Sequence, residues 1–225
     1  PQEFNSIANQ AQLDLFEQYF YDINQFSRIP GNSTEYSDML NLLNEKINIF
    51  ETTGTLTYDT DHFNLPSDLY RLGTVIYTNS TTKLVLDPVS GINTPITTLE
   101  EVEAERVNSN EILYINSSPL TKPKNVRPVY TSNTDGIKVY GDSVLTSGVK
   151  CNYIKKPATV KWGYQIVFDE ALYDASTTVN FELHSSEETE LVVKILELAG
   201  LIIKDPGIYQ IFNSEENETI QQEKS

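Results

Sequence analysis

Apolar side chains near the amino terminus recur every three or four positions, which is the spacing of one helix face. They occur within residues 5–26 and are Ile7, Ala8, Ala11, Leu15, Phe16, Tyr19, Phe20, Ile23 and Phe26. Pro30 and Gly31 end this stripe, because proline and glycine both disfavour a continuous helix. We therefore predict a first helix over residues 5–26.

A second stripe with the same spacing follows this break. Asn32 suits the N-cap of a helix, and Glu35 stands at the third position after it, as in a capping box. The apolar positions of the stripe are Tyr36, Met39, Leu40, Leu43, Ile47 and Phe50. Gly54 closes the pattern. Because the connection is short, residues 5–51 are expected to form a hairpin of two antiparallel helices.

After the second helix the pattern changes to short apolar and β-branched runs separated by Gly, Asn, Asp and Pro, which is typical of an antiparallel β unit. Strands are predicted at residues 56–58, 69–77, 83–87, 111–115, 127–131, 137–140 and 149–154. Thr98 and Glu101 fit a capping box and predict a short helix over residues 98–107. Residues 134–136, Thr-Asp-Gly, form a good hairpin turn.

Residues 158–180 show the weakest periodicity in the chain. A strand is predicted only at residues 165–168. We expect this segment to be extended chain that leaves the β unit and crosses back to the helices.

A further helix is predicted near the carboxy terminus. Ser185 and Glu188 fit the capping box S-x-x-E, in which a hydroxyl and a carboxylate satisfy two free backbone N–H groups. The apolar positions that follow at helical spacing are Leu191, Ile195 and Leu198. Gly200 is suited to the left-handed conformation that ends a helix, so the helix is expected over residues 186–199.

A second break follows at Pro206, because proline disfavours helix at the residue before it. A last helix is therefore expected over residues 206–221, with a sharp joint between Gly200 and Pro206. We expect the final few polar residues to be frayed.

Together these elements predict an α+β fold in which the amino- and carboxy-terminal helices pack together around a central antiparallel β-rich insertion. The expected divisions are a helical hairpin at residues 1–54, a β-rich insertion at 55–160, an extended arm at 161–180 and carboxy-terminal helices at 181–225. The first and last of these divisions are expected to form one helical domain.

The net charge of −16 over 225 residues argues against general binding to nucleic-acid phosphates, which needs a basic surface. Residues 122–161 nevertheless contain eight basic and two acidic residues, so they carry +6 and the rest of the chain carries −22. Two interpretations remain open for this basic segment. It is either a solvated, lysine-rich β surface or a face that pairs with the acidic face of a neighbouring copy.

The residues with reactive side chains give no catalytic or metal-binding motif. Cys151 is the single cysteine and is expected to be a small buried thiol on a strand. His62 is expected in a polar turn, and His184 is expected either to pack over the helix start at Ser185 or to hydrogen-bond it. Because neither histidine has neighbours at the spacing of a metal site, we expect no metal and no cofactor.

Adjacent carboxylates at residues 100–101, 169–170 and 187–188 leave one enzymatic alternative open, since a glycosidase uses two carboxylates. The aromatic residues that could stack on a sugar are Trp162, Tyr164, Phe168 and Tyr173. The simpler interpretation places the carboxylates at solvated helix starts and loops and the aromatic residues in a core or interface. On that interpretation the chain is not an enzyme.

No apolar run approaches the length of about 20 residues that a membrane span needs, and no leader with a basic and an apolar part is recognisable. A chain that starts at Pro1 is what removal of an initiator methionine would leave. We therefore expect synthesis in the cytoplasm and no membrane partner.

Four phrases of the chain resemble virion structural proteins of tailed bacteriophages, above all the ring (head-to-tail connector) proteins of short-tailed, crAss-like phages. The phrases are EFNSIANQAQLDLFEQYFYDINQF, LPSDLYRL, YIKKPATVKW and FELHSSEETELVVKILELAGLIIKD, at residues 3–26, 65–72, 153–162 and 181–205. The resemblance covers most of the chain in order and texture.

The resemblance implies a small subunit repeated around an axis, commonly twelvefold, in the neck or upper tail of a virion. Such rings lie below the portal protein, contact other neck and tail proteins and seal the channel through which DNA passes without sequence-specific binding. The bacterial host cytoplasm would be the place of synthesis and the virion the final location. Tail-spike or receptor-binding subunits, and a carbohydrate-active enzyme, are the alternatives.

Carried over to this sequence, the resemblance makes the hairpin at 5–51 and the helices after Ser185 the docking elements, with residues 153–162 as the exit strand and arm. The joint between Gly200 and Pro206 would let the last helix swing during assembly. The interface candidates are Phe16, Phe20, Tyr36, Trp162, Tyr164, Ser185, Glu188, Leu191, Ile195, Gly200 and Pro206.

Overall fold

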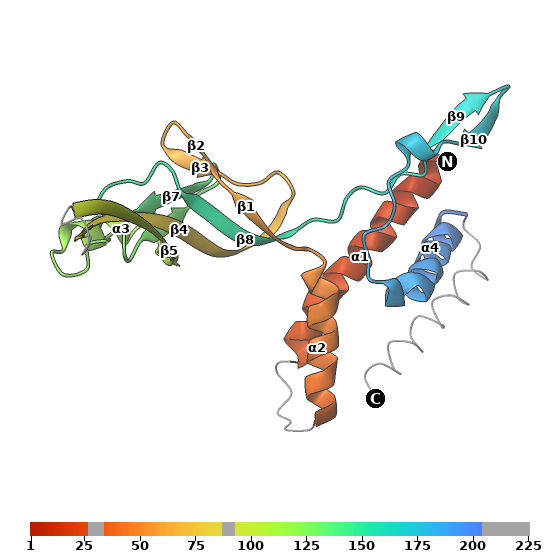
Figure 1. Cartoon of the computed structure of the whole chain (residues 1–225). Helices are drawn as coiled ribbons and strands as arrows, with labels where there is room; N and C mark the ends of the chain where they lie inside the picture. Colours follow the sequence, from red (N-terminus) through yellow and green to blue (C-terminus); the bar gives the residue numbers. More distant parts are fainter. Residues whose placement is uncertain (27–33, 87–92, 204–225) are drawn as a thin grey trace. The chain divides into compact units, whose positions relative to one another are not determined.

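The fold combines helices with one large sheet and is α+β (Figure 1). The computed structural model describes residues 1–26, 34–86 and 93–203.

The chain divides into two compact units, which are described separately below. The helical unit consists of Pro1–Phe50 with Pro157–Ser225, and the β unit consists of Glu51–Lys156. The sequence had placed these divisions at residues 54 and 160.

In the helical unit, α1 (Gln2–Phe26) and α2 (Thr34–Asn48) are followed much later by the short turn η2 (Ser185–Glu187) and α4 (Glu188–Ile203). The central members of the predicted stripe are buried, namely Ala8, Ala11, Leu15, Phe16 and Tyr19, and the prediction of the first helix is confirmed. Ala11 and Leu15 form an apolar cluster with Leu191 of α4. Phe16 packs edge-on against Phe50, with ring centroids 4.8 Å apart.

The predicted end of the second helix is wrong. The helix stops at Asn48, and Gly54 lies inside strand β1 (Glu51–Thr55) opposite Cys151. Three of the five β1 residues are threonine, and β-branched residues favour strand over helix. An added Cβ at Gly54 would lie 3.1 Å from the Tyr153 ring. Close packing against the neighbouring strand therefore explains why this position is a glycine.

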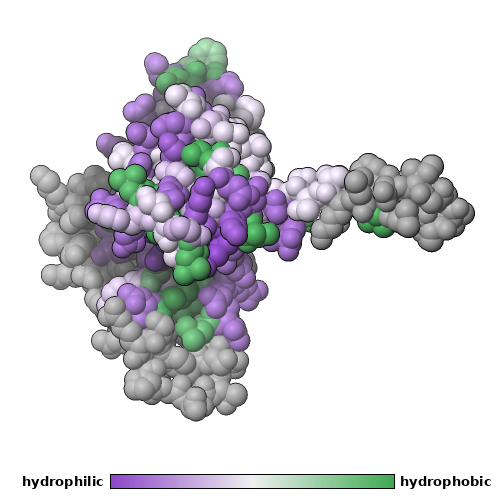
Figure 2. All heavy atoms as spheres, turned by 90° about the vertical axis from the view of Figure 1, so that its left-hand side faces the viewer, coloured by the Kyte–Doolittle hydropathy of each residue, from purple (hydrophilic) through white to green (hydrophobic). Residues whose placement is uncertain are grey.

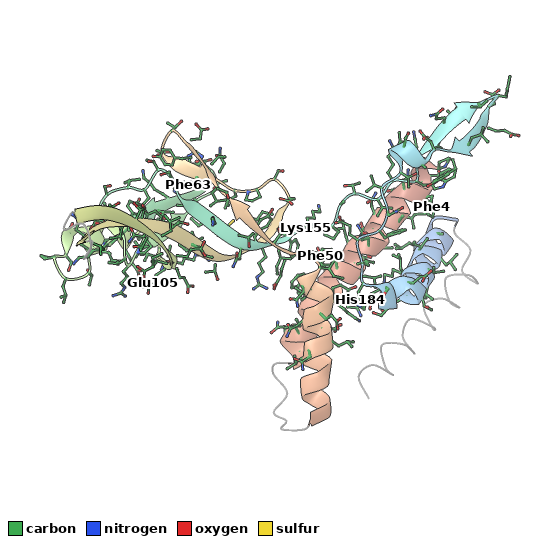
Figure 3. The ribbon with its side chains drawn as sticks, in the orientation of Figure 1. Phe4, Phe50, Phe63, Glu105, Lys155 and His184 are labelled. Atoms are coloured by element: carbon green, nitrogen blue, oxygen red, sulfur yellow. The ribbon has the colours of Figure 1, made fainter. Side chains whose placement is uncertain are left out.

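The expected capping box at Ser185 and Glu188 is also wrong. The chain first makes the turn η2, and the cap is His184, whose Nδ1 accepts the Ser186 backbone N–H at 3.2 Å (Figure 3). Of the two roles expected for His184, the hydrogen bond to the helix start is thereby confirmed. The imidazole nitrogen provides the acceptor one residue before the predicted cap.

Gly200 does not end a helix, because α4 continues through it to Ile203. The residue is buried. Burial of the apolar helix outweighs the cost of about 1 kcal/mol that glycine adds in a helix interior. Pro206 and the helix predicted over residues 206–221 lie outside the described residues.

The β unit contains one sheet of eight strands and a short helix α3 (Ile112–Ser117). Its strands are β1 (Glu51–Thr55), β2 (Thr57–Asp59), β3 (His62–Asn64), β4 (Leu69–Leu86), β5 (Asn93–Arg106), β6 (Val129–Ser132), β7 (Ile137–Tyr140) and β8 (Val149–Lys155). The strand order is β1-β8-β4-β5-β6-β7-β3-β2. Since β1 and β2 stand at opposite edges yet are separated in sequence only by Leu56, the sheet curls back on itself.

The expectation of a purely antiparallel sheet is wrong at one ladder. Strands β5 and β6 pair in parallel, with Glu105 opposite Val129. A parallel pair needs a crossover connection, and the segment that contains α3 supplies it.

The core of the β unit forms where alternate residues of the strands point inward. Phe63, Val75, Ile137 and Val149 are fully buried, and Figure 3 shows Phe63 within the β unit. Cys151 is fully buried as predicted, and burial raises the pKa of its thiol. The predicted turn at 134–136 is confirmed, since it joins β6 to β7.

Two elements of the β unit were assigned to the wrong class. Residues 98–106 of the predicted helix lie in strand β5, where Glu101, Glu103 and Glu105 are exposed in alternation with Val102 and Ala104. This alternation of exposed and more buried residues favours a strand, although the sequence also fits a helix capping box. The Thr98 hydroxyl instead donates to the Thr81 carbonyl oxygen on β4.

Residues 111–115 belong to α3 rather than to a strand. Backbone N–H groups of Ile115 and Ser118 donate to the carbonyl oxygens of Glu111 and Tyr114, so local bonds satisfy this short segment. The two strands predicted at 69–77 and 83–87 are one strand, β4, with irregular register between Leu72 and Val75.

A second, smaller sheet belongs to the helical unit. It is the hairpin of β9 (Tyr164–Val167) and β10 (Glu170–Tyr173), drawn in cyan in Figure 1 and followed by the turn η1 (Ala175–Thr177). The strand predicted at 165–168 is confirmed within one residue at each end, whereas β10 was not predicted.

Candidate functional site: an anchored apolar hairpin

The hairpin β9–β10 presents one apolar face. Tyr164 lies opposite Tyr173, and Ile166 lies opposite Ala171. Because cross-strand partners share a face, these four side chains lie together. Ile166 is 71% exposed and Tyr173 is 59% exposed. Hydrophobic atoms lie at the surface in the upper part of Figure 2, where the hairpin stands.

The tip of the hairpin is a two-residue loop formed by Phe168 and Asp169. Their φ angles are +51° and +64°, the left-handed pattern of a type I′ turn. Such turns usually contain Asn and Gly, and a bulky residue in this region is an outlier. The Phe168 side chain is 97% exposed. A strained backbone and an exposed aromatic ring at one residue point to a binding role.

The aromatic base of the hairpin brings together three residues that the sequence singled out. The Trp162 ring stacks on the Tyr164 ring with centroids 5.9 Å apart and planes 20° apart. The Tyr173 ring lies 6.3 Å from Trp162, tilted by 31°. Trp162 therefore extends the apolar face of the hairpin towards α1.

Side-chain amides of α1 hold the extended segment that leads into the hairpin. Asn9 contacts both backbone groups of Val160: its Oδ1 accepts the N–H at 2.6 Å and its Nδ2 donates to the carbonyl oxygen at 2.9 Å. Asn5 repeats this pattern on Trp162, at 2.8 Å and 3.4 Å. Each asparagine side chain thus makes the pair of hydrogen bonds that the backbone of one residue in a neighbouring β-strand would make.

The spacing of these amides along α1 explains why they reach alternate residues of the extended segment. Two positions four residues apart on a helix are separated by about 6 Å along its axis, and two alternate residues of a strand by about 6.6 Å. Gln12, one turn further along, donates to the Ala158 carbonyl oxygen at 2.9 Å and accepts the Glu182 N–H at 2.9 Å. We call Asn5, Asn9 and Gln12 the amide ladder. The pattern N-x-x-x-N-x-x-Q is its signature in the sequence, and our sequence analysis missed it.

Backbone groups on the opposite edge of the same extended segment are also hydrogen-bonded. The Lys161 N–H donates to the Val179 carbonyl oxygen at 3.1 Å, and the Val179 N–H donates back at 2.8 Å. The Glu182 carboxylate accepts the Ala158 N–H at 3.0 Å. The segment that was expected to be extended chain is extended here, and both of its edges are hydrogen-bonded, to α1 side chains and to Val179.

Asp174 fixes the base of the hairpin. Its carboxylate accepts bonds from the Ser176 backbone N–H at 3.0 Å, the Ser176 hydroxyl at 2.7 Å and the Gln165 amide at 3.0 Å. These bonds lower the pKa of Asp174 to about 2, with the Ser176 hydroxyl as the largest cause. The carboxylate thus stays ionised through mild acid.

Gly163 stands where the hairpin base is narrowest. Its carbonyl oxygen accepts the Asp174 N–H at 2.9 Å, and its N–H donates to the Thr178 hydroxyl at 3.1 Å. An added Cβ would lie 2.5 Å from the Asp174 carbonyl oxygen and 2.7 Å from the Thr178 nitrogen. Only glycine fits this close approach of two backbone segments.

A buried ion pair joins α2 to η2 within the helical unit. The Lys46 ammonium of α2 lies 2.6 Å from the Glu187 carboxylate of η2, with side chains 10% and 4% exposed. The same ammonium lies 5.5 Å from the centre of the Tyr19 ring. The sequence analysis did not single out Lys46, because a lone lysine on a polar helix resembles a solvated surface residue.

The remaining interface candidates fall into different environments. Phe16 and Leu191 are buried in the helical unit's own core. Phe20 packs edge-on against Phe16 at 5.1 Å, and Ile195 packs beside Leu191.

Three further interface candidates lie near helix ends. Ser185 and Glu188 are exposed at the start of α4. Tyr36 lies in α2, but its side chain is outside the described part of the structure. These residues do not form one site with the hairpin.

The basic segment at residues 122–161 makes ion pairs within the β unit. Exposed acidic groups of the same unit accept three of its cationic side chains. The pairs are Arg127–Glu105 at 3.2 Å, Lys138–Asp61 at 3.6 Å and Lys150–Glu101 at 3.0 Å. Part of the basic charge is therefore balanced inside one copy.

The expectation of a polar turn at His62 is wrong by one residue, because the turn ends at Asp61 and His62 begins β3. Its Nδ1 is 3.0 Å from the Asp61 carboxylate, and this bond raises the pKa of His62. The bond with His62, helped by the charge of Lys138, lowers the pKa of Asp61. Among the described residues, no group of three or more His, Cys, Asp or Glu side chains is arranged to hold a metal ion.

Within the described ranges, no helix is both long and apolar enough to cross a membrane. Neither protein-family models nor curated proteins give a match to the sequence.

Proposed function

We propose that this chain is a non-enzymatic structural subunit of a bacteriophage virion. Its place would be an oligomeric ring in the neck or upper tail, where it would connect the portal protein to the tail around the DNA channel. The observation that carries the proposal is the apolar face and tip of β9–β10, exposed on a rigid base.

The exposed hairpin favours an assembled protein for an energetic reason. An isolated two-stranded hairpin is at best marginally stable in water, and exposed apolar patches mark interaction sites. The amide ladder and Asp174 hold the base in one conformation, so that little entropy would be lost on binding. A subunit that must join neighbours reproducibly needs such a preorganised element.

The distribution of charge also supports a channel-forming role. The helical unit contains 20 acidic and 6 basic residues and carries −14, whereas the β unit contains 12 acidic and 10 basic residues and carries −2. A strongly acidic surface repels the DNA phosphates. If the helical unit lined the channel, the duplex would pass without adhering.

The finer architecture fits the same proposal. Helices from both parts of the sequence pack through Leu15 and Leu191 and would form the docking platform towards the portal or a neighbouring copy. The partners would be further copies of the chain, the portal protein and other neck or tail proteins.

Electron microscopy of the native particle tests this proposal. A rotationally symmetric ring of this chain around the DNA channel is the expected result. A single copy at a fibre tip, or absence of the chain from the virion, would contradict it.

A receptor-binding tail subunit is the second candidate, and the stacked rings of Trp162, Tyr164 and Tyr173 favour it. Flat aromatic faces are suited to packing on a sugar ring. Trp162 is the single tryptophan of the chain, so its fluorescence would report such binding. A saturable change on titration with host surface glycans would support the second candidate, and an unchanged spectrum would contradict it.

A further inference from the structure

The β unit also exposes apolar side chains, in α3 and in the segment between α3 and β6. They are Leu113, Tyr114, Leu120 and Val126, which are 72%, 80%, 94% and 61% exposed. Lys122 and Lys124 are exposed in the same segment. We call these six residues the loop patch.

Local hydrogen bonds give the loop patch a defined conformation. The Ser117 hydroxyl donates to the Leu113 carbonyl oxygen at 2.7 Å, and the Lys122 N–H donates to the Ser118 carbonyl oxygen at 3.0 Å. Lys124 and Arg127 exchange backbone bonds at 3.2 Å and 2.9 Å. The exposed apolar side chains therefore stand on a structured segment.

The loop patch and the hairpin are complementary in charge. Residues 113–126 contain two lysines and no acidic residue, whereas residues 164–173 contain Asp169 and Glu170 and no basic residue. Both surfaces combine exposed aromatic and aliphatic side chains with charge of one sign. Apolar contact would supply affinity, and the opposite charges would select the partner and its orientation.

We propose that the hairpin β9–β10 of one copy binds the loop patch of the next copy. The proposal rests on the assembled role above and names the surfaces through which copies join. Because each copy has both surfaces and the two differ, the contact is head-to-tail. Repeated head-to-tail contacts generate a ring when the rotation between copies closes.

Paired cysteine variants of the full chain test the contact. Ala171→Cys places a thiol on the apolar face of the hairpin, and Thr121→Cys places one within the loop patch; both positions are exposed. Cys151 does not compete, because it is fully buried. The two variants carry tags of different size and are mixed under oxidising conditions.

A disulfide between the two differently tagged chains is the expected product. Thr97→Cys, on an exposed position of β5, replaces Thr121→Cys in the control mixture and should give at least about tenfold less product. Equal yields in the two mixtures would overturn the proposal. A third sample, one chain that carries both Ala171→Cys and Thr121→Cys, distinguishes contact within a chain from contact between chains. If the disulfide formed only within that chain, the proposal would also be overturned.

Charge reversal provides a second measurement. The variants Lys122→Glu with Lys124→Glu, and Asp169→Lys with Glu170→Lys, should each weaken self-association by about tenfold or more in light scattering. Mixing the two variants should restore association, which a misfolded variant could not do. Unchanged association in both variants would contradict the proposal.

The two proposals fail in different ways. A ring in the native particle without the specific disulfide would remove the hairpin contact and leave the structural role intact. A specific disulfide between chains that form no ring in the particle would keep the contact and remove the connector role.

Discussion

At the scale of residues, the hairpin depends on side chains that contact only backbone. Asn5, Asn9 and Gln12 use both ends of their amides, so each removes a hydrogen-bonding requirement that water would otherwise have to meet. Burying an unsatisfied backbone group costs more than a hydrogen bond normally contributes. These small polar residues of α1 therefore contribute more to stability than their size suggests.

The change Asn9→Ala leaves the N–H and the carbonyl oxygen of Val160 without their partners. We expect the free energy of unfolding to fall by about 1–3 kcal/mol, measured by urea denaturation. Gln10→Ala is the matched control, because Gln10 bonds only the exposed Asp14 side chain on the same helix, and it should cost less than about 0.5 kcal/mol. Equal effects of both changes would disprove the role of the ladder.

The change Gly163→Ala places a methyl group against the Asp174 carbonyl oxygen and the Thr178 nitrogen. The base of the hairpin must open, and we expect a loss of about 1–3 kcal/mol. Trp162 reports the change through its fluorescence and near-ultraviolet circular dichroism, because it stacks on Tyr164. Gly54→Ala, in the other unit, should leave the Trp162 signal unaltered; loss of the signal in both variants would count against this explanation.

The pH dependence of the hairpin base follows from Asp174. Its pKa is lowered in the folded state from 3.8 to about 2, so its stabilising effect is complete above the unfolded value and is lost as pH falls through the folded value. The Trp162 signal should persist from pH 7 to about 4 and decline towards pH 2. Asp174→Asn should remove this acid transition and Asp169→Asn should not. An unchanged transition in Asp174→Asn would assign it to another group.

At the scale of elements, the pair Lys46–Glu187 connects α2 to the start of α4 away from water. Removing one partner of a buried ion pair leaves an uncompensated charge, whereas replacing both partners by apolar residues can be neutral.

Lys46→Met should therefore lower the free energy of unfolding by about 3–5 kcal/mol, and Lys46→Met with Glu187→Leu should recover most of it. The control Lys150→Met breaks the exposed pair with Glu101 and should cost about 0–1 kcal/mol. Thermal or urea unfolding measures all three variants. A double variant as unstable as the single one would show that packing, not charge, determines the loss.

The elements also show where sequence patterns succeed and where they fail. The stripe from Ala8 to Tyr19 identified α1 because one helix face is buried along its length. Glu101 was misread because it satisfies both a capping box and a strand of period two, and only the pairing with Thr78 on β4 decides between them. Gly200 was misread because a helix stop and a buried helical glycine have the same local sequence.

Prediction of the candidate site was partial for a similar reason. The aromatic residues Trp162 and Tyr164 were visible as a cluster in sequence. Their anchor was not, because Asn9 and Val160 are 151 positions apart. Contacts from side chain to distant backbone leave no local periodicity.

At the scale of the whole molecule, the β unit is continuous in sequence and interrupts the helical unit. Its first and last strands pair, with Glu51 opposite Ile154. The chain thus enters and leaves the β unit at neighbouring points, and the unit has its own core around Phe63 and Val75.

We therefore expect the fragment of residues 51–156 to fold alone, with a cooperative thermal transition and the circular dichroism of a β protein. The fragment of residues 56–156 is the control. It lacks β1 and its ladder with β8, so its transition should occur at a lower temperature. A non-cooperative transition in the longer fragment would show that the helical unit is needed for folding.

The amide ladder has a consequence for how this protein can diversify. Because Asn5, Asn9 and Gln12 recognise main-chain atoms alone, they place no demand on the identity of the exposed side chains that follow. Residues 166–171 at the outer end of the hairpin can therefore accumulate substitutions while the attachment of its base to α1 is conserved. Related chains would then share the three amides and differ at the tip, so that partner choice could evolve separately from fold stability.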